Sequence, residues 1–287
     1  MIAWPQSLVE DIARRRCVFF LGAGVSRNSV GNGGVHPATW DGFLAAALSQ
    51  CANPKTYIKR LVQATDYLTA CELLEEKLGD QWVPLLLDTF STPQYQPADL
   101  HKAIFDLDTR LVLTQNFDKI YDVYAQSETH GATVVKAYYD ADTPRVLRGS
   151  QRAVIKVHGS IDEPSKMVFT REDYARIRQD HRSFQALMDA LFLTQTFLFL
   201  GCSLSDPDLR LFLEQHAYAH PSSPAHYMTT PKGELHEGLD DSIRRNMNIR
   251  LLRYDPADSH KDLLDCIVRL GAEVAIKRDD IALRQDW

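Results

Sequence analysis

Four short segments of glycine and polar residues place the strongest constraint on how this chain can fold. They are GAGVS (22–26), TQNFD (114–118), HG (158–159) and GCSL (201–204), and they lie far apart in the sequence. Three follow an apolar run that is typical of a buried strand, and HG closes a fourth such run. Because parallel strands end at the same edge of their sheet, the sequence predicts that all four segments lie along that carboxyl edge. Such edges are where parallel sheets bind ligands.

The rest of the chain alternates between strand-like and helical patterns. Strand-like runs lie at 17–21, 110–113, 133–136, 153–157, 196–200, 226–228 and 249–254, and helical stretches lie at 5–16, 171–193, 206–219 and 260–270. This alternation predicts an α/β fold with a doubly wound, Rossmann-like parallel sheet. With 287 residues, 45% of them apolar, the chain is long enough for one large core, and we expect a single domain over 1–287.

One long segment departs from this alternation. From 39 to 106 the pattern is helical throughout, beginning with Trp40, Phe43 and Leu44 at the spacing i, i+3, i+4. We therefore expect a helical insertion at 39–106, between the first and second strands of the sheet. A loop with glycines at positions 31, 33 and 34 precedes it, and such a loop can change conformation easily, as a lid over a ligand must.

Composition and charge exclude several classes of protein. The net charge of −6 argues against direct nucleic-acid binding, because that affinity comes mainly from Lys and Arg that neutralise phosphates. No apolar stretch approaches the length of a membrane span, and the start lacks the basic head and apolar core of a secretory signal. We therefore expect a cytoplasmic protein. The five cysteines are scattered, with no C-x-x-C pair, which excludes a structural zinc ribbon and leaves no metal site.

GAGVS has glycines where a phosphate-binding turn needs them. Gly22 permits a tight turn out of the strand, and Gly24 lets a pyrophosphate approach the backbone. The usual dinucleotide fingerprint has a third glycine where this chain has Arg27, so a plain strand-to-helix turn explains the segment about equally well.

GCSL also precedes an expected helix. It would offer backbone amides and the Ser203 hydroxyl to a phosphate or ribose. The simpler interpretation is that Asp206 caps the following helix, with Pro207 as its first residue, and we expect this cap in either case.

TQNFD and HG carry the side chains with the most chemistry. Asn116 offers a donor and an acceptor to a water or a ribose hydroxyl, whereas ionised Asp118 can only accept. Asn and Asp also commonly cap helices, and taken alone that interpretation is favoured here. His158 ends a strand, where a histidine is well placed to act as a general base, although a single histidine is more often structural.

In this order and combination, the four segments resemble the sirtuin family of NAD-consuming enzymes, over residues 17–254. By this resemblance, the pyrophosphate is held by Gly22, Ala23, Gly24 and Ser26, and the ribose and nicotinamide are surrounded by Thr114, Gln115, Asn116 and Asp118. Gly201 and Ser203 would close the NAD site, and His158 would be the catalytic histidine. The match of TQNFD is complete and is the most specific of the four.

Two elements of the protein-deacylating sirtuins are absent from the sequence. Those enzymes have a zinc ribbon with two C-x-x-C pairs after the histidine, and no such pair lies between His158 and Gly201. They also have a GIPDFR run where this chain has GGVHPATW at 33–40. The chain resembles instead the zinc-free branch, whose members hydrolyse NAD in bacterial defence against phage, often beside a HerA-type ATPase or an Argonaute-like protein.

The resemblance implies a zinc-independent NAD+ glycohydrolase that releases nicotinamide and ADP-ribose from NAD+, its substrate. Asn116 would hold the water and the ribose, and His158 would accept a proton. We expect control by homo-oligomerisation or by a partner. Two alternatives remain: an NAD-dependent deacylase or ADP-ribosyltransferase, which needs an acceptor groove, and a non-catalytic NAD- or ADP-ribose-binding assembly subunit. The second would have no need of both Asn116 and His158.

Overall fold

A seven-stranded, wholly parallel sheet forms the centre of the molecule. The computed structural model describes residues 1–53, 55–204 and 206–286. The strands are β1 (Cys17–Leu21), β2 (Leu111–Thr114), β3 (Val134–Ala137), β4 (Ala153–Lys156), β5 (Thr196–Leu200), β6 (His226–Pro231) and β7 (Ile249–Tyr254), in the spatial order β3-β4-β2-β1-β5-β6-β7. The chain builds outward from β1 in one direction and then returns to β5 on its other side. This reversal confirms the predicted doubly wound, Rossmann-like sheet.

The strand register brings the four polar segments to one level. Leu21 lies beside Thr114 of β2 and Leu200 of β5, and Thr114 lies beside Lys156 of β4. The residues that follow these four strand ends therefore meet at the carboxyl edge, on both sides of the point where the strand order reverses.

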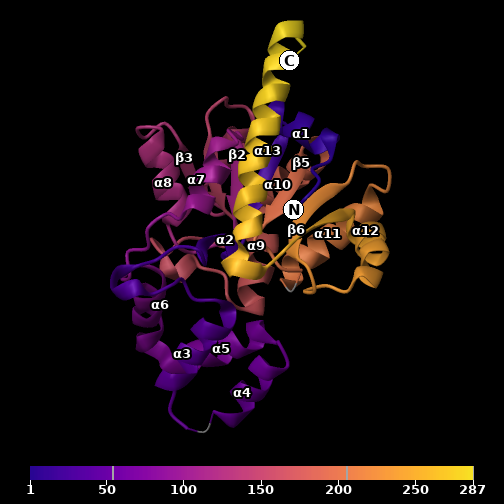
Figure 1. The fold of residues 1–287 in the computed structure, drawn as a ribbon. Helices are drawn as coiled ribbons and strands as arrows, with labels where there is room; N and C mark the ends of the chain where they lie inside the picture. The colour runs from indigo at the N-terminus through magenta and orange to yellow at the C-terminus, as the bar shows by residue number, and fades with distance from the viewer. Residues whose placement is uncertain (54, 205, 287) are drawn as a thin grey trace.

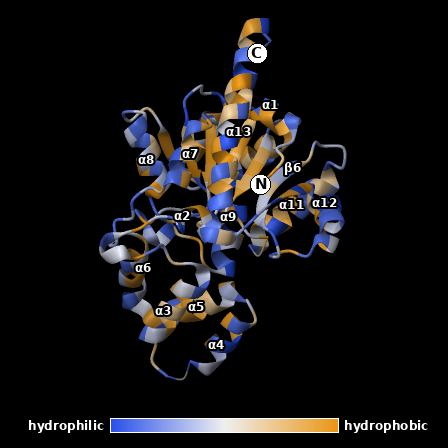
Figure 2. Ribbon diagram, viewed as in Figure 1, coloured by the Kyte–Doolittle hydropathy of each residue, from blue (hydrophilic) through white to orange (hydrophobic). Residues whose placement is uncertain are grey.

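Helices cover both faces of the sheet, as Figure 1 shows. Along β1, Cys17, Phe19 and Leu21 pack into one core and Val18 and Phe20 into the other, because successive side chains of a strand point to opposite faces. The first core is covered by α1 (Gln6–Ala13), α7 (Asp99–Asp106), α8 (Ile120–Glu128) and α13 (Ala257–Arg284). The second is covered by α9 (Arg171–Asp180), α10 (Arg182–Thr194), α11 (Pro207–Ala219) and α12 (Asp240–Met247). Figure 2 shows hydrophobic strands between helices with hydrophilic outer sides.

Four further helices form a separate cluster below the carboxyl edge in Figure 1. They are α3 (Trp40–Gln50), α4 (Thr56–Gln63), α5 (Tyr67–Leu78) and α6 (Trp82–Phe90), and they share a third core. That core also contains Phe117, Ile161 and Phe169, so it packs directly on the segments that follow TQN and HG. α7 lies within the expected 39–106 insertion but packs in the sheet-covering layer with α13.

Two helices differ from the expected boundaries. The helix expected at 171–193 is interrupted at His181, whose φ of −110° and ψ of 50° separate α9 from α10. The last helix was expected to end near 270 but continues to Arg284, because Val274 and Ile281 extend its buried face beyond that point.

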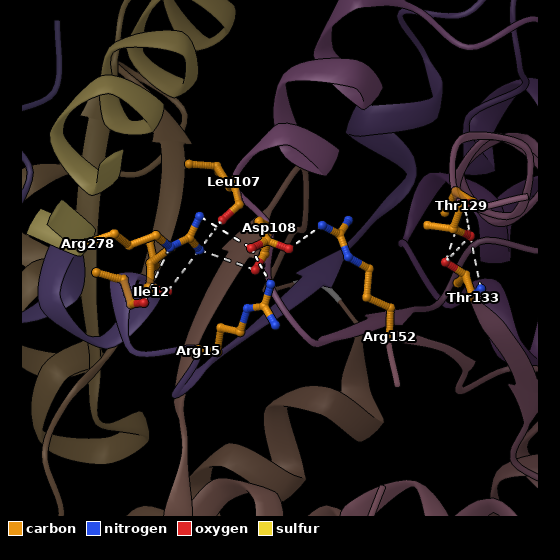
Figure 3. Close-up of polar contacts among 10 residues, drawn as sticks. Ile12, Arg15, Leu107, Asp108, Thr129, Thr133, Arg152 and Arg278 are labelled. Atoms are coloured by element: carbon orange, nitrogen blue, oxygen red, sulfur yellow. Dashed lines mark hydrogen bonds and ion pairs between the residues drawn. The ribbon is translucent and has the colours of Figure 1, made fainter. Parts of the chain in front are cut away.

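At the amino edge of the sheet, one carboxylate links three arginines. Asp108, which precedes β2, forms ion pairs with Arg15, Arg152 and Arg278 (Figure 3). Arg278 also donates hydrogen bonds to the backbone carbonyl of Leu107 at 2.9 Å. The cluster connects α13 to the beginnings of β1, β2 and β4, on the side of the sheet opposite the four polar segments.

Candidate active site

The two glycine segments pack against each other at the centre of the carboxyl edge. Gly22 N donates to Leu200 O at 2.9 Å, and Gly24 N donates to Gly201 O at 2.9 Å. A Cβ atom on Gly24 would lie 2.8 Å from Gly201 Cα, and one on Gly22 would lie 2.5 Å from Gly201 O. Gly201 itself has a φ of +62°, which favours glycine. These glycines are therefore required by the contact between the two loops, whatever they also bind.

A large open cavity lies over this contact, with a volume of about 1130 Å³. Its centre is lined by Ala23, Gly24, Arg27, Gln115, Gly201 and Ser203. One end reaches the four-helix cluster and α9, and the other reaches the ends of β6 and β7 and the start of α13. A cavity at the reversal of strand order is the usual ligand site of this fold.

The TQNFD segment holds its asparagine in one orientation. Thr114 Oγ1 donates to Leu21 O at 3.0 Å and accepts from Asn116 N at 3.1 Å. Asn116 Nδ2 donates to Gly22 O at 3.0 Å and to Ser26 Oγ at 2.9 Å. Since a backbone carbonyl can only accept, the amide nitrogen must face Gly22. Both amide donors are thus used, and Asn116 offers a ligand its Oδ1 oxygen.

Asp118 forms an Asx-type turn just before α8, whose N-cap residue is Lys119. Its Oδ1 accepts from Ile120 N at 3.0 Å, at the start of α8, and the side chain is buried.

Lys156 is a buried lysine next to this segment. It is 1% exposed, donates to Asp118 O and lies 3.7 Å from an Asp122 carboxylate oxygen. Burial raises the pKa of Asp122, and Lys156 opposes that rise. Lys156 was not predicted as part of the site, although a lysine inside the apolar run AVIKV is a detectable signal.

His158 lies at the same edge, beside two residues from distant segments. Its ring packs edge-on against Tyr174 of α9, with centroids 5.3 Å apart, and its Nε2 lies 3.9 Å from Asp206 Oδ2. Asp206 caps α11 as expected, since its Oδ1 accepts from Leu209 N at 2.9 Å. The sequence favoured a helix cap for Asp206, and its position facing His158 depends on the fold.

A small apolar pocket of about 60 Å³ adjoins His158 and Asn116. Its aromatic wall is formed by Trp40, Phe43, Phe90, Phe117 and Phe169. Phe117 and Phe169 are 4.5 Å apart between ring centroids, and Phe43 stacks on Phe169 at 5.5 Å. Of these rings, the helical spacing in the sequence included only Trp40 and Phe43, and their place beside the candidate catalytic residues depends on the tertiary structure. Next to this wall, Gln115 Oε1 is buried without a hydrogen-bond partner among the described residues.

The far end of the large cavity contains three polar residues, Tyr254, His260 and Glu234, that were not predicted from the sequence. Tyr254 Oη and His260 Nδ1 are 3.0 Å apart, and Glu234 lies in the same wall. Burial raises the pKa of Glu234, and the nearby His260 acts in the opposite direction. His36, which precedes the four-helix cluster, lines the cavity but has its Nδ1 2.8 Å from Ser29 O.

The segment between His158 and Gly201 forms α9, α10 and β5. Across residues 1–53, 55–204 and 206–286, no group of three or more His, Cys, Asp or Glu side chains is arranged to hold a metal ion. No helix in the same part of the chain is both long and apolar enough to cross a bilayer.

Comparison with known proteins identifies the domain. The family model described as SIR2-like domain matches residues 110–252, which include TQNFD, His158 and GCSL. The chain carries a SIR2-like domain. This match confirms the sirtuin-like resemblance. GAGVS and the four-helix cluster lie before the matched residues of the SIR2-like domain.

The relatives of this SIR2-like chain include proteins named for NAD hydrolysis and for defence. NAD(+) hydrolase ThsA of Enterococcus faecium is 31% identical over 132 residues, which is 45% of this chain and 27% of that protein. NAD(+) hydrolase ThsA of Bacillus cereus is 26% identical over 171 residues, 60% of this chain and 35% of that protein. Defense-associated sirtuin 2 of Bacillus subtilis is 22% identical over 290 residues, 96% of this chain and 28% of that protein. The chain thus spans about a third or less of the length of these relatives.

Proposed function

We propose that this chain hydrolyses NAD+ at the bond between nicotinamide and ribose, releasing nicotinamide and ADP-ribose. The observation that carries the proposal is that Asn116 and His158 line one small pocket, which shares Ala23, Gln115 and Asp206 with the large cavity over the two glycine loops. A dinucleotide fits such a site, because close backbone approach suits a pyrophosphate and carbonyl and imidazole groups suit a ribose. The relatives named NAD(+) hydrolase support the same reaction.

In this proposal, the pyrophosphate lies over Gly22, Ala23, Gly24 and the GCSL loop, where Gly201 and Ser203 line the cavity. The nicotinamide ribose lies toward Gln115 and Asn116, and the adenosine lies toward Glu234 and His260. The Gln115 Oε1, buried without a partner among the described residues, is placed to accept from the nicotinamide amide or a ribose hydroxyl. Ser26, Thr114 and Asp118 support this surface, since all three are buried and hydrogen-bonded within the fold.

The chemistry requires little more than charge placement and a positioned water. Breaking the glycosidic bond develops positive charge on the ribose, as in other glycoside hydrolyses. Asn116 Oδ1 accepts a hydrogen bond from the water or from a ribose hydroxyl and so places a partial negative charge beside that centre. His158 accepts a proton from the attacking water or from a ribose hydroxyl. The aromatic wall then receives the flat, uncharged nicotinamide as it leaves.

The biological setting follows from the relatives and is also proposed. The names of the Bacillus subtilis and Bacillus cereus relatives support an NAD-depleting effector of anti-phage defence. An enzyme that consumes NAD must be restrained until it is needed, and we propose control by homo-oligomerisation in the cytoplasm or by a HerA-type ATPase or Argonaute-like partner. No direct nucleic-acid contact is proposed, because the chain has a net charge of −6.

The test is release of nicotinamide and ADP-ribose from NAD+ by the purified chain, at low and high protein concentration. We expect Asn116→Ala and His158→Ala each to lower the rate by at least roughly 100-fold, in the range of a lost general base. His130→Ala is the matched control, because His130 is exposed and lies in neither cavity. Equal rates in wild type and both site variants would exclude this mechanism.

Two other outcomes would replace the proposal. Binding of NAD+ without release of nicotinamide, at any protein concentration and with candidate partners, would leave a non-catalytic NAD- or ADP-ribose-binding assembly subunit. Nicotinamide release that depends on an acylated peptide or a protein acceptor would indicate a deacylase or an ADP-ribosyltransferase.

A further inference from the structure

The imidazole of His158, which follows β4, faces a carboxylate from the segment that follows β5. Its Nε2 lies 3.9 Å from Asp206 Oδ2, and both side chains are 12% exposed. His158 follows β4, whereas Asp206 lies between β5 and α11. In the sheet, β2 and β1 separate β4 from β5. The pair is therefore a product of the fold and not of local sequence.

Asp206 is held in place by contacts of its own. Its Oδ1 accepts from Leu209 N at 2.9 Å, which is the cap of α11. Its Oδ2 accepts from Tyr174 Oη at 3.3 Å, and the Tyr174 ring packs edge-on against the His158 ring at 87°. Tyr174 belongs to α9. One oxygen thus anchors the carboxylate, and the other is directed toward His158.

From this arrangement we propose that Asp206 is a positioning residue for His158 and that Tyr174 supports it. This inference rests on the proposed NAD hydrolysis. The negative charge of Asp206 favours the imidazolium that forms when His158 accepts its proton, and the ring contact with Tyr174 fixes the plane of the imidazole. Asp206 does not take the proton. The 3.9 Å separation is longer than a hydrogen bond, as is common for catalytic pairs before substrate binds.

The decisive variant is Asp206→Asn. Asparagine is as good a helix cap as aspartate, so the bond to Leu209 N and the start of α11 are retained while the charge is lost. We expect kcat for nicotinamide release to fall roughly 10- to 100-fold, a part of the 10²–10⁴ that a general base supplies. KM for NAD+ and the melting temperature should change little. Tyr174→Phe keeps the ring and removes the hydroxyl, and we expect a smaller fall in kcat.

A double variant separates a role through His158 from a direct role on NAD+. If Asp206 acts through His158, Asp206→Asn should lower kcat in the wild-type background and have no further effect in His158→Ala. A full loss in both backgrounds would overturn the inference and assign Asp206 to the substrate. Asp140→Asn is the matched control, because the Asp140 carboxylate also accepts a backbone N–H, from Ala137 at 2.8 Å, but lies outside both cavities.

A second readout does not depend on activity. The ring ¹⁵N resonances of His158, assigned by their loss in His158→Ala, should shift in Asp206→Asn and stay in place in Asp140→Asn. If wild type binds NAD+ but releases no nicotinamide, the proposed hydrolysis fails while this measurement still decides whether the pair exists. Unchanged His158 resonances in Asp206→Asn would overturn the pairing itself.

Discussion

Asn116 Nδ2 donates a hydrogen bond to Ser26 Oγ over 2.9 Å, and this bond joins the segment after β2 to the segment after β1. Ser26 is 3% exposed and lines the small pocket beside Asn116. Together with the bond to Gly22 O at 3.0 Å, it fixes the amide so that Oδ1 is the atom left for a ligand. In the proposed reaction, Ser26 therefore acts on NAD+ through the orientation of Asn116.

Ser26→Ala should reduce catalysis without abolishing it. The variant leaves Asn116 with one of its two anchors, and the loss of one ordinary hydrogen bond corresponds to roughly a three- to tenfold fall in kcat. Nicotinamide release at saturating NAD+ measures the effect, with the exposed Ser127→Ala as control. An unchanged kcat would mean that Gly22 O alone orients the amide.

Gly24→Ala should disrupt the contact between the two glycine loops. The added Cβ would lie 2.8 Å from Gly201 Cα and 2.9 Å from Gly201 O, and backbone atoms cannot move aside as a flexible side chain can. We expect a loss of stability of about 1–3 kcal/mol and at least a tenfold weaker binding of NAD+. Denaturant unfolding and calorimetry are the measurements.

Gly42→Ala provides the matched control for that substitution. Gly42 lies in α3, and the nearest atom to an added Cβ is 3.7 Å away. Alanine favours the helix by up to about 1 kcal/mol relative to glycine, so this variant should be as stable as wild type or slightly more stable. Equal losses in both variants would show that the Gly24–Gly201 contact is not the cause.

Lys156→Met should destabilise the protein by about 3–5 kcal/mol, because it leaves a buried carboxylate and a buried carbonyl without their cationic partner. The carboxylate is that of Asp122, 3.7 Å from Lys156 Nζ, and the carbonyl is that of Asp118. The double variant Lys156→Met with Asp122→Asn removes the isolated charge and should recover part of the loss. Urea unfolding measures both, and a double variant that is no more stable than the single one would rule out charge burial as the cause.

Acid should destabilise the protein through two buried histidines. Burial lowers the pKa of His101 to about 4, although the nearby Asp118 acts in the opposite direction. Burial and the neighbouring His216 lower the pKa of His226 to about 4. Between pH 6.5 and 4 the unfolded chain binds more protons than the folded chain, so stability is present above this window and is lost as the pH falls through it. Each histidine accounts for about 3 kcal/mol at most.

Asparagine at these positions tests the acid effect. Nδ1 of His101 accepts from Ala98 N and Nδ1 of His226 accepts from Phe197 N, and an amide oxygen can take over both bonds. His101→Asn and His226→Asn should each flatten the dependence of unfolding free energy on pH between 6.5 and 4. His130→Asn, at an exposed site, should leave the slope as in wild type. An unchanged slope in both buried-site variants would assign the acid loss to other groups.

Local sequence patterns were enough to predict the sheet and the edge at which the candidate site lies. Apolar runs of strand length and the glycine or polar residues directly after them are local features, and the backbone responds to them locally. Because parallel strands share an edge, strand ends alone were enough to predict that Gly22, Asn116, His158 and Gly201 come together. The helical spacing at Trp40, Phe43 and Leu44 likewise predicted helices before the second strand.

Contacts between distant segments set the partners of each side chain at that edge. Asn116 uses both its donors on Gly22 and Ser26, and Asp206 faces His158. Phe169 closes the pocket beside them. These arrangements depend on contacts between segments 45 to 100 residues or more apart. The same holds for α13, whose length beyond residue 270 follows from burial of Val274 and Ile281. Local patterns specify backbone conformation, whereas hydrogen-bond partners and burial are set by packing, which no short window of the sequence contains.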